Sequence, residues 1–276
     1  MPDHLTLDLL QRLIRRLTLT PSAPDLYVGG AGEGGVTENA RLFGGLVAAQ
    51  ACMAALQTVD EFPLHSLHAY FLRPGRAQAD INFHVARSKQ GRNFAVRSVS
   101  AEQNGELIFQ MLASFQRPEQ GVHHQPLMPD APPPEGLPNR DQMRGRAHWR
   151  QMPIDVRMVT EITGNHPQPG EQELWLGVNG AFPDDPNLHM ALVVYASDRC
   201  LLDTAWRPHA DQGELSGASL DHAMWFHRAP RFDDWLLYAT SSPAAAAGRG
   251  LALGSIFDRQ GNLVVSVAQE GVLRSR

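Results

Sequence analysis

Lysine is almost absent from this chain of 276 residues. Lys89 is the only lysine among 24 basic residues, and nowhere do Lys and Arg form a run. The 29 acidic residues bring the formal net charge to −5. A mildly acidic chain without a basic patch has no surface suited to phosphate backbones, so no nucleic-acid partner is expected.

Cysteine and long apolar stretches are scarce as well. Cys52 and Cys200 could form one bridge, but they are too few for a disulfide framework and lack the Cys-x-x-Cys spacing of structural zinc. No apolar stretch reaches 18 residues, so no membrane-spanning helix is expected, and the N-terminus is unlike a secretory signal. Hydrophobic residues still make up 43% of the chain, enough for a packed core. These features predict a reduced, cytoplasmic protein.

Two stretches of the chain are apolar nearly all round. Leu42 to Val59 and Leu188 to Trp206 are rich in small and aliphatic residues, and such helices must be buried on most sides. A third helix is predicted from Leu7 to Leu17, where apolar residues recur at helical spacing and arginines occupy the other faces. We expect this third helix to pack on the outside of the fold.

Strand-like patterns follow both buried helices in the same order. Four strands are predicted at 65–72, 79–88, 93–103 and 106–116, and four more at 218–227, 235–241, 248–257 and 263–273. Others, at 26–28, 154–159 and 173–179, precede the helices. His68 to Phe71 aligns with His222 to Trp225 at an offset of 154 residues, and Asn104-Gly105 predicts a hairpin turn. The chain is therefore interpreted as a tandem duplication of one unit.

A sheet wrapped around one apolar helix is the hot-dog architecture. The predicted fold class is α+β, a double hot-dog in which two units pair sheet edge to sheet edge. The predicted domains are 1–118 and 146–276, the second carrying the catalytic residues, with a proline-rich linker at 119–145. We expect the linker around Pro132 to Pro134 to run over the surface and to tolerate an insertion.

A glycine-rich segment, 29–35, formally matches the dinucleotide-binding fingerprint. Gly30, Gly32 and Gly35 have the required spacing. No helix is predicted to open at Gly35, and no alternation of strands and helices follows, so we interpret the segment as a flexible loop.

Several stretches closely resemble the acyl-CoA thioesterase II family of double hot-dog hydrolases. The similarity covers about residues 26 to 274 and is weakest from Val122 to Gln172. It is carried by 43–47, 68–75, 195–198, 220–228, 235–238 and 269–272, of which the aromatic-rich Leu220 to Arg228 is the most specific. The chain departs from the family in the loop predicted after Tyr238, where Pro243 and four alanines replace hydroxyl-rich sequence.

The resemblance implies a function and a site. Members of the family cleave fatty acyl-CoA to free acid and coenzyme A with no metal, no cofactor and no covalent enzyme intermediate. An Asp, a Ser or Thr, and a Gln hold the attacking water, and the matching motifs place them at Asp198, Ser219 and Gln269. Acyl-CoA is the implied substrate and partner, and a homo-oligomer is expected.

The residues themselves leave alternatives at each of these positions. Asp198 ends an apolar run, where a carboxylate is costly unless it is bonded or used, but it could instead pair with Arg199 or Arg231. Ser219 lies two residues before Asp221, so in one strand both would face one side and His222 the other, which argues against a Ser-His-Asp triad. Gln269, taken alone, is as consistent with a solvent-facing strand residue.

Two other functions remain open on the sequence. A hot-dog hydratase or dehydratase of enoyl thioesters needs a histidine placed with a carboxylate on a buried helix, which neither Ala49-Gln50-Ala51 nor Asp198-Arg199-Cys200 supplies. The second is a non-catalytic acyl-CoA-binding module, which the Asp, Ser and Gln set disfavours. The twelve histidines lack His-x-x-x-His spacing, so they do not indicate a metal site.

Overall fold

A computed structural model describes residues 4–30, 41–143, 153–161, 166–178, 180–213 and 215–275. Most of the glycine-rich segment predicted as a loop lies outside these ranges. None of the helices within them is both long enough and apolar enough to cross a membrane.

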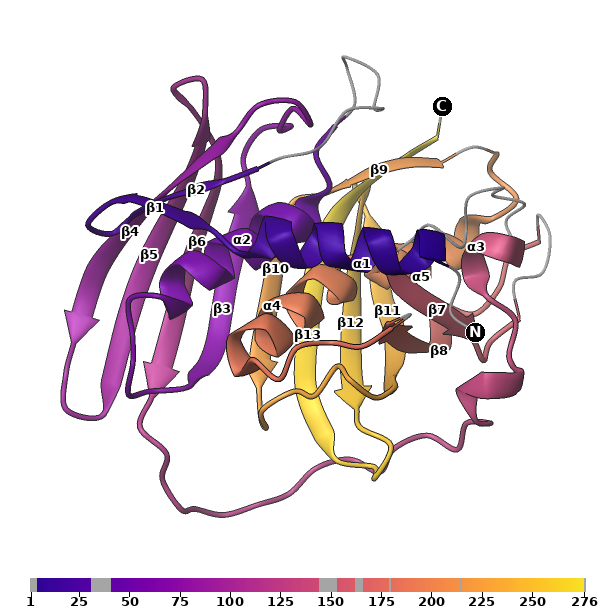
Figure 1. The fold of residues 1–276 in the computed structure, drawn as a ribbon. Helices are drawn as coiled ribbons and strands as arrows, with labels where there is room; N and C mark the ends of the chain where they lie inside the picture. The colour runs from indigo at the N-terminus through magenta and orange to yellow at the C-terminus, as the bar shows by residue number, and fades with distance from the viewer. Residues whose placement is uncertain are drawn as a thin grey trace.

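The molecule is built on one antiparallel sheet (Figure 1). The first part of the chain supplies β1 (Thr20–Ala23), β2 (Leu26–Gly29), β3 (Leu64–Phe71), β4 (Ile81–Gln90), β5 (Phe94–Gln103) and β6 (Glu106–Gln116). The second part supplies β7 (Ile154–Met158), β8 (Glu171–Val178), β9 (Leu215–Ser219), β10 (Asp221–Phe226), β11 (Leu236–Ala246), β12 (Arg249–Phe257) and β13 (Leu263–Ser275). The order is β1-β2-β4-β5-β6-β3-β10-β13-β12-β11-β8-β7, and β9 pairs with β13. The two parts therefore form mirror-ordered halves, and the prediction of a double hot-dog is confirmed.

The two halves meet where β3 pairs with β10, which is the predicted edge-to-edge junction. His68 lies opposite Ala223, and Ala69 lies opposite His222. The alignment at an offset of 154 residues nevertheless pairs side chains that have different environments. His68 is exposed, with its ring against Trp225, whereas His222 is completely buried. The similar His-Ala pairs lie on opposite faces of the sheet, because side chains in a strand alternate.

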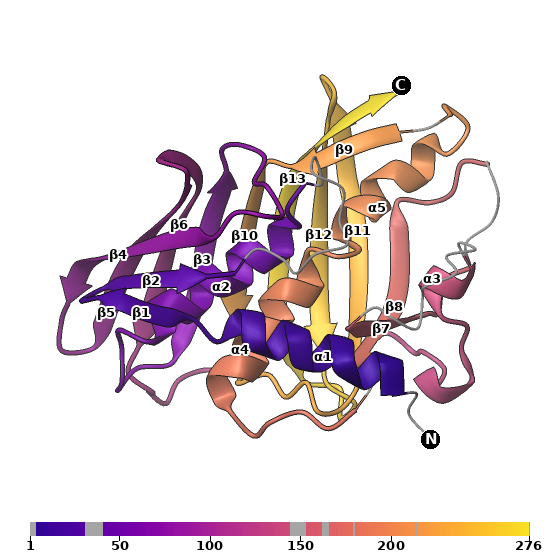
Figure 2. The same cartoon turned by 45° about the horizontal axis from the view of Figure 1, so that its top comes forward.

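Both apolar stretches form helices on the same face of the sheet. α2 (Gly44–Leu56) is buried from Gly45 to its end, and α4 (Pro186–Ser197) packs against it. Small residues such as Ala48 and Ala191 allow this close contact. The amphipathic helix α1 (His4–Leu17) contacts both, as predicted for an outer packing helix (Figure 2).

The second buried helix is shorter than the sequence predicted. It ends at Ser197, and a separate helix, α5 (Leu201–Trp206), follows and continues into the 3-10 turn η3 (Arg207–His209). The N–H groups of Asp198 and Arg199 both donate to the carbonyl of Ala196, which tightens the last turn. The break escapes a pattern argument because Cys200 and Leu201 continue the apolar run and no Gly or Pro marks it.

The hairpins follow the predicted turn chemistry, with one correction. Asn104 and Gly105 have φ of 51° and 79°, the paired positive values of a type I′ turn. The loop predicted after Tyr238 is wrong, because β11 continues through Pro243 to Ala246. The β11–β12 pairing shifts its register between Ser241 and Ala244, and such a bulge accommodates a proline that cannot donate to the ladder.

The linker is docked onto the second half of the sheet rather than lying free. Its 3-10 turn η1 (Pro134–Gly136) buries Pro134, and the indole Nε1 of Trp175 donates to the Pro132 carbonyl at 2.9 Å. It then forms the short helix α3 (Arg140–Met143). The expectation that Pro132 to Pro134 would tolerate an insertion stays a prediction, which the buried Pro134 and the hydrogen bond to Pro132 disfavour.

Candidate active site

Asp198 lies at the carboxyl end of α4, as the residue that terminates the helix. Only 9% of it is exposed. A carboxylate is unfavourable at this position, because the helix dipole places partial negative charge there. Burial adds to that cost unless donors surround the group. Asp198 therefore needs specific hydrogen-bond donors from other elements.

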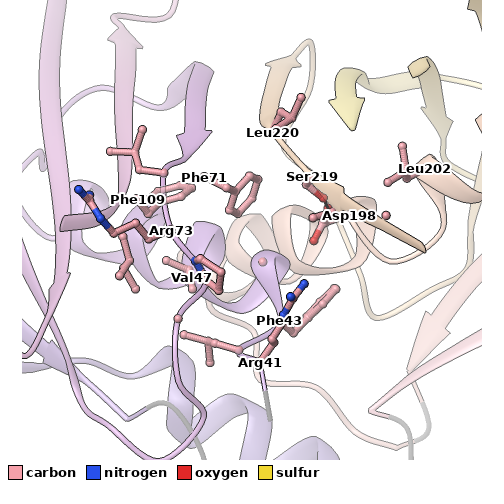
Figure 3. Close-up of a pocket in the computed structure, with 18 of the residues that line it drawn as sticks. Arg41, Phe43, Val47, Phe71, Arg73, Phe109, Asp198, Leu202, Ser219 and Leu220 are labelled. Carbon is pink, nitrogen blue, oxygen red and sulfur yellow. Dashed lines mark hydrogen bonds between the residues drawn. The ribbon is translucent and has the colours of Figure 1, made fainter. Parts of the chain in front are cut away.

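Ser219 and Gln269 supply those donors. The Ser219 hydroxyl donates to Oδ1 of Asp198 at 3.0 Å, and the Gln269 amide Nε2 donates to the same oxygen at 2.5 Å. Figure 3 shows the Ser219 and Asp198 side chains facing each other. The three residues that the family motifs indicated, far apart in the chain, are thus brought together in one hydrogen-bonded group.

The other carboxylate oxygen of Asp198 faces the beginning of α2. A Cβ added to Gly44 would lie 3.1 Å from Oδ2, so a side chain at this position would press on the carboxylate. α2 begins at Gly44, and its first internal hydrogen bond is donated by Leu46 to the carbonyl of Phe43. The N–H groups of Gly44 and Gly45 belong to the first turn, where a helix leaves its donors without internal partners.

A bulge between β9 and β10 orients Ser219. Ser219 lies opposite Gly271 of β13, while Ala223 lies opposite Ala268, so one strand has an extra residue at Leu220. The expectation that Ser219 and Asp221 share one face of a single strand is wrong, because one extra residue moves the following side chains to the other face. Asp221 instead accepts the N–H of Glu270 at 2.7 Å.

Gln269 is fully buried in β13, so the alternative of a solvent-facing strand residue is wrong. It lies opposite Ala252 of β12, next to the bulge. Its Nε2 bonds Asp198, and its Oε1 has no partner among the described residues. A buried carbonyl-type oxygen beside the carboxylate can therefore accept one more hydrogen bond.

His222 lies behind the site and escaped the sequence argument. The bulge turns it inward, where its Nε2 is 2.8 Å from the hydroxyl of Ser197, the residue before Asp198. The hydroxyl donates to the carbonyl of Val194, so His222 acts as the donor through Nε2. Burial lowers the pKa of His222, although the carboxylates of Asp198 and Asp221 oppose the shift. A neutral histidine thus supports the last turn of α4.

The two arginines considered as partners of Asp198 each have a described bond to another carboxylate. Arg231 bonds Asp184 and Asp233 on the surface. Arg199 bonds Asp141, which the linker contributes. No pattern in the sequence indicates this contact, because 58 residues separate Arg199 from Asp141, and Asp141 lies in the part of the chain least like the family.

A cavity of about 430 Å³ opens beside Asp198 and Ser219. Both halves of the chain line it. The first half contributes an apolar wall, including Val47, Phe71 and Phe109, and also Arg41 and Arg73 (Figure 3). The second half contributes Asp198, Arg199, Leu202, Asp203, Trp206 and Gly217 to Leu220. Two of the three predicted site residues, Asp198 and Ser219, thus line a cavity that neither half forms alone.

Known proteins resemble this chain over most of its length. The model of the acyl-CoA thioesterase family matches residues 146–272, and the model of the acyl-CoA thioesterase N-terminal domain matches residues 34–116. Acyl-coenzyme A thioesterase 8 of Rattus norvegicus is 37% identical over 94% of this chain and 88% of its own.

Solved structures agree with these matches. An acyl-CoA thioesterase II from Mycobacterium marinum is 40% identical, with a TM-score of 0.81 over 96% of this chain and 98% of that chain. A hot-dog protein of Alicyclobacillus acidocaldarius, at 19% identity and a TM-score of 0.80 over 96% and 98% of the two chains, shares the fold alone. The chain therefore belongs to the acyl-CoA thioesterase II family of double hot-dog thioester hydrolases.

Proposed function

We propose that this chain hydrolyses fatty acyl-CoA by direct attack of a water molecule held by Asp198, Ser219 and Gln269. The observation that carries the proposal is the convergence of the Ser219 hydroxyl and the Gln269 amide on one oxygen of Asp198, beside a cavity. Such a set provides one base and two neutral groups that orient a water.

Asp198 acts as the general base. Its carboxylate accepts a proton from the water as the water oxygen attacks the thioester carbonyl carbon. The carbon–sulfur bond then breaks, and the sulfur leaves with the proton that Asp198 returns. The products are the free acid and coenzyme A.

Ser219 and Gln269 fix the position of the water. Because the Ser219 hydroxyl donates to Asp198, its lone pairs are left to accept from the water. The buried Oε1 of Gln269 offers a second acceptor. The water has two protons: it directs one toward the carboxylate and donates the other to one of these two acceptors, which leaves its lone pair toward the substrate.

The first turn of α2 stabilises the developing oxyanion. The N–H groups of Gly44 and Gly45 lie at the positive end of the α2 dipole, and Gly44 lines the cavity that Asp198 also lines. Backbone donors of this kind stabilise negative charge as it forms on the carbonyl oxygen.

Different residues of the cavity suit the acyl chain and the coenzyme A part of the substrate. The apolar wall of Val47, Phe71 and Phe109 suits an acyl chain. Arg41 and Arg73 line the same cavity, and Arg41 is exposed, so they are the proposed partners of the coenzyme A phosphates.

The test is release of free thiol from acyl-CoAs of graded chain length by the purified protein and by Asp198→Asn. This change keeps the shape of the side chain and removes the base. We expect turnover to fall about 100-fold or more, the scale of a lost general base. Thermal unfolding of both proteins checks that the variant is folded. Turnover near that of the unchanged protein would refute the role of Asp198.

A second assay separates water attack from covalent catalysis and from the rival functions. Ser219→Thr should be active, Ser219→Ala should keep measurable activity, and mass spectrometry should find no acyl group on Ser219. Enoyl-CoA should not be hydrated, because the one histidine of α4, His189, lies nine residues before Asp198, about 13 Å along the helix. Trapping an acylated Ser219 would contradict the direct-water mechanism.

We further propose that the protein forms a homo-oligomer. Tyr70, Leu112 and Trp225 are exposed on β3, β6 and β10, around the junction of the halves. A group of large apolar side chains on a sheet face favours association. Light scattering after size-exclusion chromatography measures the mass, and a single monomeric species at micromolar concentration would contradict this.

A cytoplasmic location and a role in lipid metabolism remain predictions. Cys52 and Cys200 are buried and form no disulfide within the described part of the chain, which is compatible with a reducing compartment. Fractionation of the source cells, followed by immunoblotting, tests the location.

A further inference from the structure

The last residue of α4, Ser197, is held by the sheet through two separate bonds. Its hydroxyl lies 2.8 Å from Nε2 of His222 on β10, and its carbonyl accepts the hydroxyl of Tyr238 on β11 at 3.2 Å. All three residues are completely buried. Carbonyls in the last turn of a helix have no partner within the helix, so partners from the strands fix where α4 ends. Ser197, His222 and Tyr238 thus form one group, the Ser197 anchor.

Tyr238 reaches Ser197 because Gly254 leaves room for its ring. Gly254 of β12 lies opposite Thr240, two residues along β11 from Tyr238. A Cβ added to Gly254 would overlap the Tyr238 ring and would lie 2.9 Å from its hydroxyl oxygen. The φ of Gly254 is not positive, so the glycine is explained by the space that the tyrosine needs and not by backbone conformation.

The anchor acts on the peptide unit that carries Asp198. The carbonyl of Ser197 and the N–H of Asp198 belong to one planar unit, which also contains the Cα of Asp198. Tyr238 bonds the oxygen of this unit, and the N–H of Asp198 donates to the carbonyl of Ala196. The unit is therefore held at both of its polar groups, which fixes the point from which the Asp198 side chain projects.

Asp198 needs this support because its place at the helix end is unfavourable for a carboxylate. The helix dipole puts partial negative charge there, so unwinding of the last turn would move the carboxylate to a more favourable position. Ser219 and Gln269 both bond the same carboxylate oxygen, Oδ1, which by itself does not fix the whole group. A general base must lie within hydrogen-bond distance of the proton that it takes, so small displacements lower the rate.

We propose that His222 and Tyr238 are positioning residues for the reaction: through Ser197, they fix the peptide unit from which the Asp198 carboxylate projects toward the water. The inference rests on the proposed function, since it assumes that Asp198 is the base. Neither His222 nor Tyr238 is among the residues that line the cavity, so both act through Asp198 without touching the substrate.

Both residues bond Ser197 as neutral donors. The Ser197 hydroxyl donates to the carbonyl of Val194, which leaves the donor role to Nε2 of His222. Burial lowers the pKa of His222 and raises the pKa of Tyr238 well above its usual value, so neither is charged at pH 7. Removing either donor therefore changes the geometry around Asp198 without removing a charge.

The first test compares kcat and KM of the full chain and of Tyr238→Phe on one acyl-CoA. This change removes one hydroxyl and keeps the ring over Gly254. We expect kcat to fall about 3- to 30-fold, because a displacement of about 1 Å at a catalytic group can cost about 100-fold. KM should stay within about twofold, because the cavity lining is unchanged. An unchanged kcat would overturn the inference.

Two variants of His222 test the other bond of the anchor. His222→Gln keeps an N–H donor near the place of Nε2, whereas His222→Leu fills a similar space without a donor. The Gln variant should keep most of kcat, and the Leu variant should lose about 3- to 30-fold. This pair carries the test by itself if Tyr238→Phe does not fold. Equal kcat in the two His222 variants would contradict the positioning role.

A double variant shows whether the anchor acts through Asp198. Once Asp198 is Asn, there is no base to position, so adding Tyr238→Phe should leave the residual kcat of Asp198→Asn unchanged. Non-additivity of this kind is expected of residues that act as a unit. A further loss in the double variant, by the same factor as in Tyr238→Phe alone, would show a general structural role.

Thr240→Val is the matched control. Thr240 carries a buried hydroxyl on the same strand and face as Tyr238, but it bonds Thr204 of α5 at 2.7 Å and the carbonyl of Gln172 at 3.1 Å. Its loss should lower the midpoint of thermal unfolding and leave kcat within about twofold, because α4 keeps its bonds. Equal losses of kcat in Thr240→Val and Tyr238→Phe would mean that stability alone explains the effect.

Failure of this inference is distinguishable from failure of the proposed function. Full turnover in Asp198→Asn would refute the base itself. Loss of turnover in Asp198→Asn together with full kcat in Tyr238→Phe would refute the positioning role alone.

Discussion

At the scale of single residues, the site depends on how one carboxylate is surrounded. Asp198 lies where a helix end disfavours negative charge, and two neutral donors from different strands compensate. The family motifs were sufficient to select these three residues. They could not indicate His222, because its contact with Ser197 depends on a strand bulge. Nor could they indicate Asp141, because its contact with Arg199 depends on the docked linker.

Gln269 offers the sharpest test of the proposed water site. Gln269→Ala removes a neutral donor and acceptor, so turnover should fall about 10- to 1000-fold, the range for one positioned polar group. The acidic limb of the pH–rate profile should remain where Asp198 sets it. Gln269→Glu should be worse than Ala near pH 7, because two adjacent carboxylates resist joint ionisation. Steady-state kinetics on one acyl-CoA measures both, and equal activity of all three proteins would contradict the water site.

His222 should make the fold sensitive to acid. Burial lowers its pKa, so below the usual histidine value of 6.5 the unfolded chain binds a proton that the folded chain excludes. The free energy of unfolding should therefore fall as the pH drops below 6.5, by up to about 1.4 kcal/mol per pH unit for this group.

Urea unfolding of the full chain and of His222→Gln, between pH 5 and 7, measures this slope. The variant should lose less stability on acidification. Some slope should remain, because burial also lowers the pKa of His65, His189 and His227. Equal slopes in the two proteins would contradict the prediction.

At the scale of elements, the sequence predicted well which segments are helices and which are strands, and less well where each one begins and ends. Apolar composition was enough to identify α2, because all of it but Gly44 is buried. It could not find the end of α4, because no Gly or Pro marks it, or the bulge at Leu220, because that bulge is set by pairing with the distant strand β13. The same limit applies to β11, where pairing with β12 carries a strand through Pro243.

The two ends of the linker should respond differently to an insertion. A short Gly-Ser insertion after Gln120 enters an exposed segment and should cost under about 1 kcal/mol, because loop-closure entropy grows slowly with length. The same insertion after Pro133 displaces the buried Pro134 and the acceptor of Trp175. It should cost about 1–3 kcal/mol, the penalty of an unsatisfied buried group. Chemical unfolding compares the two, and equal stability would contradict the docking of the linker.

At the scale of the whole molecule, we propose that the domains 1–118 and 146–276 are units that need each other. The strands β3 and β10 are the edge strands of their own halves and pair with each other, and α2 packs on α4. The cavity also takes its apolar wall from the first half. Separation would expose a sheet edge and an apolar helix face together.

A fragment of residues 146–276 should therefore be unstable and inactive, although it contains Asp198, Ser219 and Gln269. Circular dichroism and thiol release measure both properties. Co-expression with residues 1–124 should restore part of the activity. A stable, monomeric and fully active fragment would refute the interdependence of the halves.

The mirror order of the sheet has a consequence for how the two halves could diverge. Asp198 follows the last residue of α4, whereas the residue that follows α2 is the uncharged Gln57. In a dimer of two identical single-unit chains, the same residue would have to follow the buried helix in both subunits. In one fused chain the two copies can differ in sequence, so α4 can keep the acid at its end while α2 contributes its amino-terminal turn. We therefore expect a single turnover centre per chain, because the residue after α2 is the uncharged Gln57.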